Sequence, residues 1–222
     1  MESENKKIKL VDEQAFQEFL SVMFSCLQLE NSRKDSKICV TYRNAKNFSW
    51  FKAGDELEVA LKSLYESKEK DCWISIAEFS EERRDQNYVA SIKAFYLRLP
   101  KTRKFNPTTK DDGLNMILDY CEAYKLSTPS VIIYDGNEYC LMWILKEPLG
   151  GGYSSVELWK KIQSFLAERF FYFLDEGLYI YDEKIYRKTA FGQMRIKIFV
   201  VANVVAKKKV PLNDIITIKK TK

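Results

Sequence analysis

The N-terminal third of the chain shows two helical patterns separated by a strand pattern. Apolar residues recur at helical spacing from Asp12 to Leu29, and Asp12 is placed to cap the first turn. The segment from Lys37 to Arg43 alternates and is rich in β-branched residues, which predicts a strand. A weaker helical pattern runs from Asp55 to Ser67. We therefore expect residues 1–70 to form a small N-terminal helical or accessory lobe.

From Cys72 onward the pattern changes to strands. The run CWISIAEF and the longer run VASIKAFYLRL, which ends at Pro100, predict two strands joined by a polar loop. The segment from Lys101 to Lys110 contains a proline and has no apolar period, so it predicts a basic loop. A helix capped by Asp111 or Asp112 is expected to follow and to end before residue 127.

The clearest local signal is a hairpin. The runs SVIIY and YCLMWIL flank a turn rich in Asp, Gly and Asn. Three glycines at 150–152 then interrupt the chain before a helix predicted from Ser155 to Leu174. The segment YIY at 179–181 and the run over residues 198–205 are the last two predicted strands. The resulting order, β-β-α-β-β-α-β-β, predicts an α+β fold with a mixed or antiparallel sheet and helices packed on it.

The amino-acid composition excludes several kinds of catalytic and metal chemistry but does not identify a function. The chain has 222 residues and contains no histidine, which excludes histidine-based nucleophilic or acid–base catalysis and the common zinc sites. Its five cysteines are far apart and form no metal-binding pair. The net charge of +5 suits a polyanionic partner. No segment has the length and hydrophobicity of a membrane helix or signal core, so we expect no membrane association and a cytoplasmic protein.

Three segments resemble the signatures of the archaeo-eukaryotic primase (AEP) superfamily, in particular the primase-polymerase core of plasmid and phage replication proteins. The first family signature ends a strand with Asp-x-Asp, and here the strand reads AFYLRLP, with Arg98-Leu99-Pro100 at that place. The second is a hairpin. In PSVIIYDGNEYCLMW, Gly136, Asn137, Tyr139 and Trp143 match it, whereas Cys140 stands where the family has a phosphate-contacting histidine.

The third signature is an aspartate followed by a basic segment. In YIYDEKIYRKTAFGQMRIK, Asp182 stands at the carboxylate position, Arg187 at an arginine, and Arg195 where the family has lysine. The resemblance covers residues 72–204. It implies a fold like that of the RNA-recognition motif (RRM-like), with a primase-like α+β core at 71–206 and a basic C-terminal tail at 207–222.

The substitutions argue against catalysis. Two-metal nucleotidyl transfer needs several carboxylates around the ions, and an arginine cannot be a ligand because its positive charge repels them. Asp182 would be the one retained family carboxylate, so we expect no metal, no cofactor and no firm catalytic residue. The alternative is an active DNA primase or polymerase with Mg²⁺ or Mn²⁺ held by rearranged carboxylates, drawn from Asp135, Glu138, Asp182 and Glu183. A third possibility is a protein-interaction scaffold.

We expect instead a primase-like, replication-associated protein that binds nucleic acid, DNA more readily than RNA, or other replication proteins. Arg98 would either neutralise a phosphate or replace the lost metal by pairing with Asp182. Aromatic residues such as Tyr139 could stack on bases, although Trp143 is better interpreted as core. The candidate phosphate-binding residues are Arg98, Lys101, Arg103, Lys104, Arg187, Arg195 and Lys197.

Overall fold

The computed structural model describes residues 14, 35–42, 47–52, 55–66, 72–134, 138–170, 195–198, 201–203, 212 and 215. The helix expected over 12–29 and the basic tail at 207–222 lie almost entirely outside these residues. The elements in chain order are β1 (Lys37–Tyr42), β2 (Asn47–Lys52), α2 (Asp55–Glu66), β3 (Cys72–Ser75), β4 (Ala77–Phe79), η1 (Gln86–Tyr88), β5 (Val89–Pro100), α3 (Lys110–Ala123), β6 (Val131–Tyr134), β7 (Glu138–Gly150), α4 (Tyr153–Arg169), β8 (Arg195–Ile198) and β9 (Val201–Asn203).

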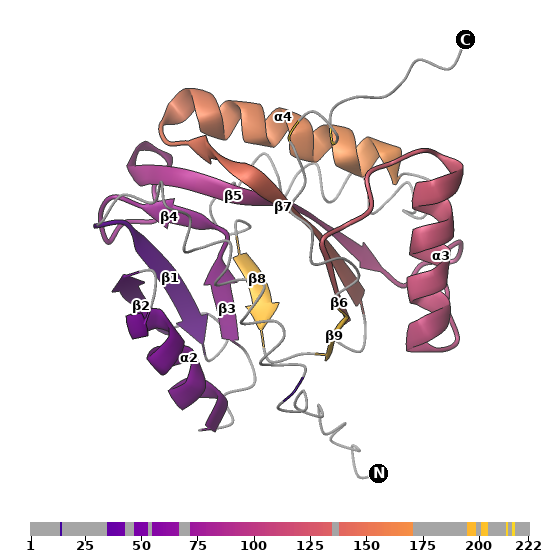
Figure 1. Cartoon of the computed structure of the whole chain (residues 1–222), viewed down its shortest axis with the longest axis horizontal. Helices are drawn as coiled ribbons and strands as arrows, with labels where there is room; N and C mark the ends of the chain where they lie inside the picture. Colours follow the sequence, from indigo (N-terminus) through magenta and orange to yellow (C-terminus); the bar gives the residue numbers. More distant parts are fainter. Residues whose placement is uncertain are drawn as a thin grey trace.

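The described strands form one antiparallel sheet in the order β8-β3-β1-β4-β5-β7-β6-β9, with β2 added to β1. We call β8, β3, β1, β2 and β4 the first arm, and β5, β7, β6 and β9 the second arm. Figure 1 shows α2 beside β1 and β2 of the first arm, α4 along β5 and β7, and α3 at the end of the second arm. The predicted α+β fold with an antiparallel sheet is confirmed.

The sheet crosses the boundary expected at residue 70. Strand β1 pairs with β3 and β4, so residues 37–42 lie inside the sheet rather than in a separate lobe. Strand β2, with the sequence NFSWFK, is an element that the sequence patterns missed. The single strand expected over 198–205 is instead two short strands, and β8 and β9 lie at opposite ends of the strand order.

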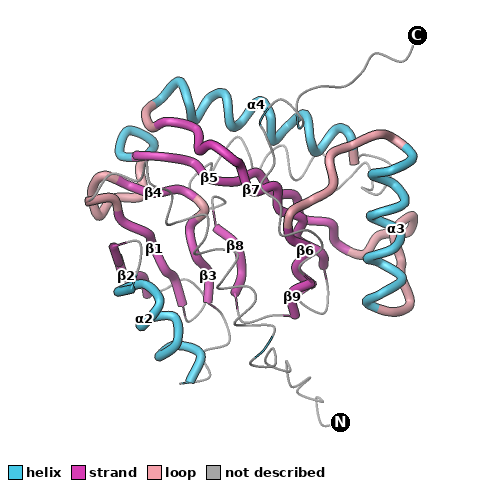
Figure 2. The backbone as a smooth tube through the Cα atoms, viewed as in Figure 1, coloured by secondary structure: helices cyan, strands magenta, loops and turns pink. Residues whose placement is uncertain are grey.

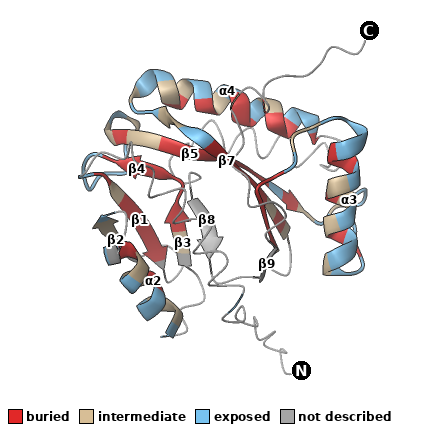
Figure 3. Cartoon of the chain, in the orientation of Figure 1, coloured by how far each residue is buried: buried red, intermediate tan, exposed pale blue. Residues whose placement is uncertain are grey.

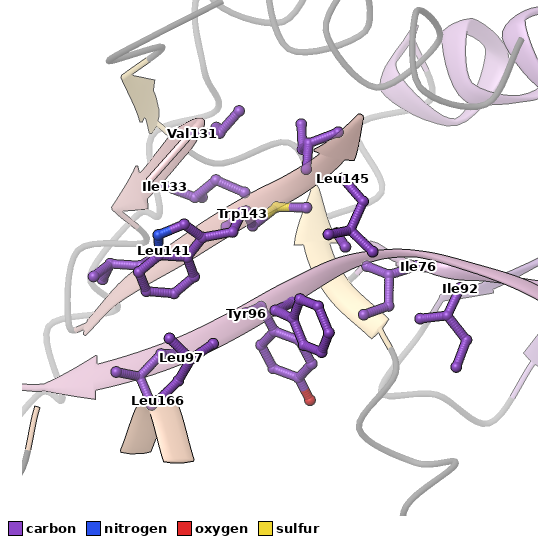
Figure 4. Close-up of a cluster of buried hydrophobic side chains, with 14 of the residues drawn as sticks. Ile76, Ile92, Tyr96, Leu97, Val131, Ile133, Leu141, Trp143, Leu145 and Leu166 are labelled. Carbon is purple, nitrogen blue, oxygen red and sulfur yellow. The ribbon is translucent and has the colours of Figure 1, made fainter. Parts of the chain in front are cut away.

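The core lies where strands meet helices. Strands carry most of the buried residues and helices expose their outer faces, as Figures 2 and 3 show together. In the second arm, Leu97, Leu141 and Trp143 of β5 and β7 cluster with Leu166 of α4 (Figure 4). Every one of these four side chains is at most 5% exposed. Burial of this size stabilises a chain by roughly 1.5–3 kcal/mol for each large apolar side chain.

Helix α3 begins at a capping box. Thr109 is the N-cap residue, where the sequence had suggested Asp111 or Asp112. The backbone N–H of Asp112 donates to Thr109 Oγ1 at 3.1 Å, and the N–H of Thr109 donates to Asp112 Oδ2 at 3.0 Å. Asp112 therefore acts as the second half of the box, because its carboxylate reaches back to the residue before the helix.

Helix α4 replaces a neighbouring strand along part of β5. Strand β4 covers only the first residues of β5, from Val89 to Ile92. Further along, the buried Gln163 side chain accepts from the Tyr96 N–H at 3.0 Å and donates to the Tyr96 carbonyl at 2.6 Å. Trp159 Nε1 donates to the Ala94 carbonyl at 3.0 Å. These side chains satisfy backbone groups that no strand of the described sheet reaches.

Candidate nucleic-acid interface

Strand β5 presents Arg98 near its C-terminal end. Side chains alternate between the two faces of a strand, so Arg98 shares a face with Tyr96, and Leu97 and Leu99 point to the opposite, helix-covered face. The hydrogen bonds from Gln163 hold the strand two residues before Arg98. The guanidinium is thus mounted on a rigid element rather than on a loop.

The structure brings two of the sequence signatures together at this point. Arg98 is directly opposite Cys140 in the β5–β7 register, and Pro100 is opposite Glu138. In the resemblance drawn from the sequence, Arg98 takes the place of a metal-binding aspartate and Cys140 that of the histidine.

Glu138 is the charged partner of Arg98 among the described residues. Arg98 donates from Nε to Glu138 Oε1 at 2.7 Å and also from Nη2 to the same oxygen. The Arg98 guanidinium further lies over the Trp73 ring, 5.8 Å from its centroid, in a cation–π contact that joins the two arms. The expected alternative partner, Asp182, lies outside the described residues.

The ion pair governs the charge state of Arg98. Burial acts to lower the pKa of Arg98, but the charge of Glu138 and its hydrogen bonds outweigh burial, so the pKa lies above its ordinary value. Arg98 is therefore a permanent cation. Its side chain is 49% exposed and that of Glu138 is 20% exposed, so solvent reaches the pair.

The loop after β5 adds three exposed cations, Lys101, Arg103 and Lys104. Buried Phe105 and Pro107 anchor this loop. Its backbone is closed by a bond from the Thr102 N–H to the Phe105 carbonyl at 2.8 Å. Lys101 follows β5 directly, so its Cα lies within about 11 Å of that of Arg98.

Two more of the predicted basic residues lie on β8. The backbone of Lys197 is paired with that of Trp73, and Arg195 with Ser75. Lys197 therefore lies at the register position beside the aromatic residue that contacts Arg98. Arg187, Asp182, Gly136 and Asn137, which were also singled out from the sequence, lie outside the described residues.

Tyr139 and Trp143 belong to the opposite face from Arg98, because they are paired with Leu99 and Phe95. Tyr139 is fully buried, and its hydroxyl donates to the Lys110 carbonyl at 3.1 Å. Trp143 is 1% exposed, and its Nε1 donates to the Ser127 carbonyl at 2.8 Å. The core interpretation of Trp143 is confirmed, whereas base stacking by Tyr139 is excluded because its ring is covered.

The aromatic residue that does lie at Arg98 is Trp73, which the sequence analysis did not select. It is one of four tryptophans in the chain and stands in an ordinary strand pattern, so no sequence signal separates it from a core residue. Within the described parts of the chain, no group of three or more Cys, Asp or Glu side chains could hold a metal ion. None of the described helices is long and apolar enough to cross a membrane.

The chain was compared with protein families, curated proteins and solved structures. No family model matches the chain, and no curated protein does. Among solved structures, the AEP domain of the primase-polymerase (PrimPol) of cyanophage S-2L matches with a TM-score of 0.53, over 94% of this chain and 98% of that one. The chain has a primase-polymerase-like fold.

The two sequences are 10% identical, so the likeness concerns the fold. It agrees with the fold that the resemblance of the three segments implied. The likeness therefore establishes a primase-polymerase-like fold.

Proposed function

We propose that this chain is a primase-like, replication-associated protein that binds nucleic acid through its phosphates and does not transfer nucleotides. The observation that carries the proposal is Arg98, a half-exposed cation paired with Cys140 where the two segments that resemble primase signatures lie side by side. A guanidinium there attracts phosphate oxygens and repels divalent cations.

The ion pair between Arg98 and Glu138 argues against a metal site built from rearranged carboxylates. Glu138 is one of the carboxylates from which an active enzyme could draw its metal ligands, and the Nε and Nη2 groups of Arg98 both donate to its Oε1. A metal at this place would have to displace a positive charge that is already hydrogen-bonded. We therefore favour binding over nucleotidyl transfer.

The cations around Arg98 suit a polymer rather than a single anion. The loop that follows β5 carries Lys101, Arg103 and Lys104. In the first arm, the backbone of Lys197 in β8 pairs with that of Trp73 in the neighbouring strand β3. Each phosphate that a protein neutralises releases counterions, so the affinity of such a surface falls with salt. We propose DNA as the preferred partner, with contacts to other replication proteins as a further role.

The test is a titration of the purified protein against labelled single-stranded and double-stranded DNA and RNA at two salt concentrations. Each titration is repeated with Mn²⁺ and nucleoside triphosphates, and products are separated on a gel. Salt-sensitive binding that ignores metal and gives no extended product is expected. Arg98→Ala should weaken binding and reduce the slope of log K against log salt by roughly 0.7–1, the value of one lost phosphate contact.

Arg169→Ala is the matched control, because Arg169 is an exposed arginine at the end of α4, where it contacts Phe165. It should bind as the unmodified protein does. Metal-dependent primer synthesis or extension would overturn the proposal in favour of an active enzyme. Absence of binding to all four nucleic acids would favour a protein-interaction scaffold.

A further inference from the structure

The Arg98 guanidinium already holds a carboxylate on the edge that would bind a phosphate. Its Nε and Nη2 groups both donate to Glu138 Oε1. These two N–H groups form one side of the planar fork with which arginine recognises phosphate and carboxylate oxygens. A phosphate that uses this side must take the place of the Glu138 oxygen.

This ion pair differs from the structural one nearby in the fold. Lys93 and Glu78 join β5 to β4 at 2.6 Å, and their side chains are only 4% and 1% exposed. Arg98, in contrast, leaves 49% of its side chain exposed. A buried pair cannot exchange partners without opening the core, whereas an arginine that solvent reaches can.

We propose that Glu138 is a specificity-determining residue that competes with the ligand for Arg98, which rests on the phosphate-binding role proposed above. Ligand binding exchanges the Glu138 carboxylate for a phosphate on the same N–H groups. The Arg98 guanidinium also lies over the Trp73 ring, and this cation–π contact does not involve Glu138. Trp73 therefore keeps the cation in place while the carboxylate leaves.

The competition selects a class of ligand. A lone phosphate gains Arg98 as a charged partner but must displace Glu138 from it, so the net gain in binding free energy is small. A chain of phosphates also reaches Lys101, Arg103 and Lys104, whose contribution Glu138 does not oppose. The site thus discriminates in favour of polyphosphate ligands, including a nucleic-acid backbone, and against isolated orthophosphate.

The test compares Glu138→Gln with the unmodified protein, with inorganic orthophosphate, inorganic tripolyphosphate and a labelled single-stranded oligonucleotide as probes. Removing a partly exposed ion pair is expected to tighten binding of each probe by about two- to fivefold. Orthophosphate should gain the larger factor, since it has fewer other contacts. Glu147→Gln is the control, because Glu147 is an exposed glutamate on the same strand and its loss changes the net charge equally.

A double-mutant cycle separates competition from a general charge effect. The gain from Glu138→Gln should vanish in an Arg98→Ala background. If the gain persists there, or if Glu147→Gln matches it, the inference is wrong while phosphate binding stands. If the unmodified protein binds and loses affinity on Arg98→Ala but Glu138→Gln changes nothing, the inference alone fails. If neither the unmodified protein nor Glu138→Gln binds any probe, both this inference and the proposed function fail.

Discussion

Replacing Gln163 by methionine tests whether a side chain of α4 serves as a substitute strand for β5. The Gln163 amide is 1% exposed and makes two hydrogen bonds to the backbone of Tyr96, whose side chain is also buried. Methionine has a similar length and flexibility and makes neither bond. Gln163→Met therefore removes the polar contacts with little change in volume.

The expected loss of stability follows from those two contacts. A buried backbone group left without its partner costs about 1–3 kcal/mol, so two such groups cost about 2–6 kcal/mol. Burying a thioether in place of an amide recovers part of this, which leaves a net loss of about 2–3 kcal/mol. With a urea m-value of about 2–3 kcal/mol/M, the unfolding midpoint should fall by roughly 1 M.

Urea unfolding followed by circular dichroism and tryptophan fluorescence measures this change. Lys161→Met, on the exposed face of the same helix, is the control and should stay within about 0.5 kcal/mol of the unmodified protein. If Gln163→Met falls within the same margin, the amide is not needed by β5. The account of how α4 positions the strand that carries Arg98 would then be refuted.

Three further predictions concern α3 and the residues beneath it. Thr109→Ala should lower the free energy of unfolding by about 1 kcal/mol in urea titrations, because it removes the N-cap of α3. Gly113→Ala should destabilise by about 1–3 kcal/mol, since a Cβ there would lie 2.1 Å from the hydroxyl of the buried Tyr139. Burial raises the pKa of Tyr139 from 10.0 to about 12. The stability that comes from keeping Tyr139 neutral is fully present below pH 10 and should be lost as the pH rises through about 12, as thermal unfolding across that range would show.

Each of these has a matched control. Thr109→Ser keeps the capping hydroxyl and should differ little from the unmodified protein. A Cβ at Gly150 would lie 3.9 Å from Ser155 Oγ, an ordinary contact distance, so a loss from Gly150→Ala as large as that from Gly113→Ala would contradict the steric explanation. Tyr139→Phe removes the titrating group. A difference titration against this variant that shows tyrosinate forming near pH 10 would contradict the burial effect.

The sequence patterns predicted the second arm well because its signals are local. The hairpin of β6 and β7 follows from two apolar runs around a short turn, and the helix predicted from Ser155 is present as α4, which buries Trp159 and Leu166. In these cases, neighbours in the sequence determine the structure.

Contacts between distant segments could not be predicted in the same way. The partner of Arg98 is Glu138, across the β5–β7 pair, and its aromatic neighbour Trp73 comes from the other arm. The boundary expected at residue 70 missed that β1 pairs with β3 and β4. Alternation of apolar residues shows that a segment is a strand, but it does not specify which strand will lie beside it.

Strands β8 and β9 impose an order on folding. They are separated by only two residues, yet β8 pairs with β3 of the first arm and β9 with β6 of the second. The Cα atoms of Ile198 and Val201 can be at most about 11 Å apart, so this short connection must bridge both arms at once. Pairings over such long sequence separations are slow to form. During synthesis, one edge of β3 and one edge of β6 therefore stay unpaired until residues 195–203 emerge, and unpaired strand edges of this kind promote aggregation.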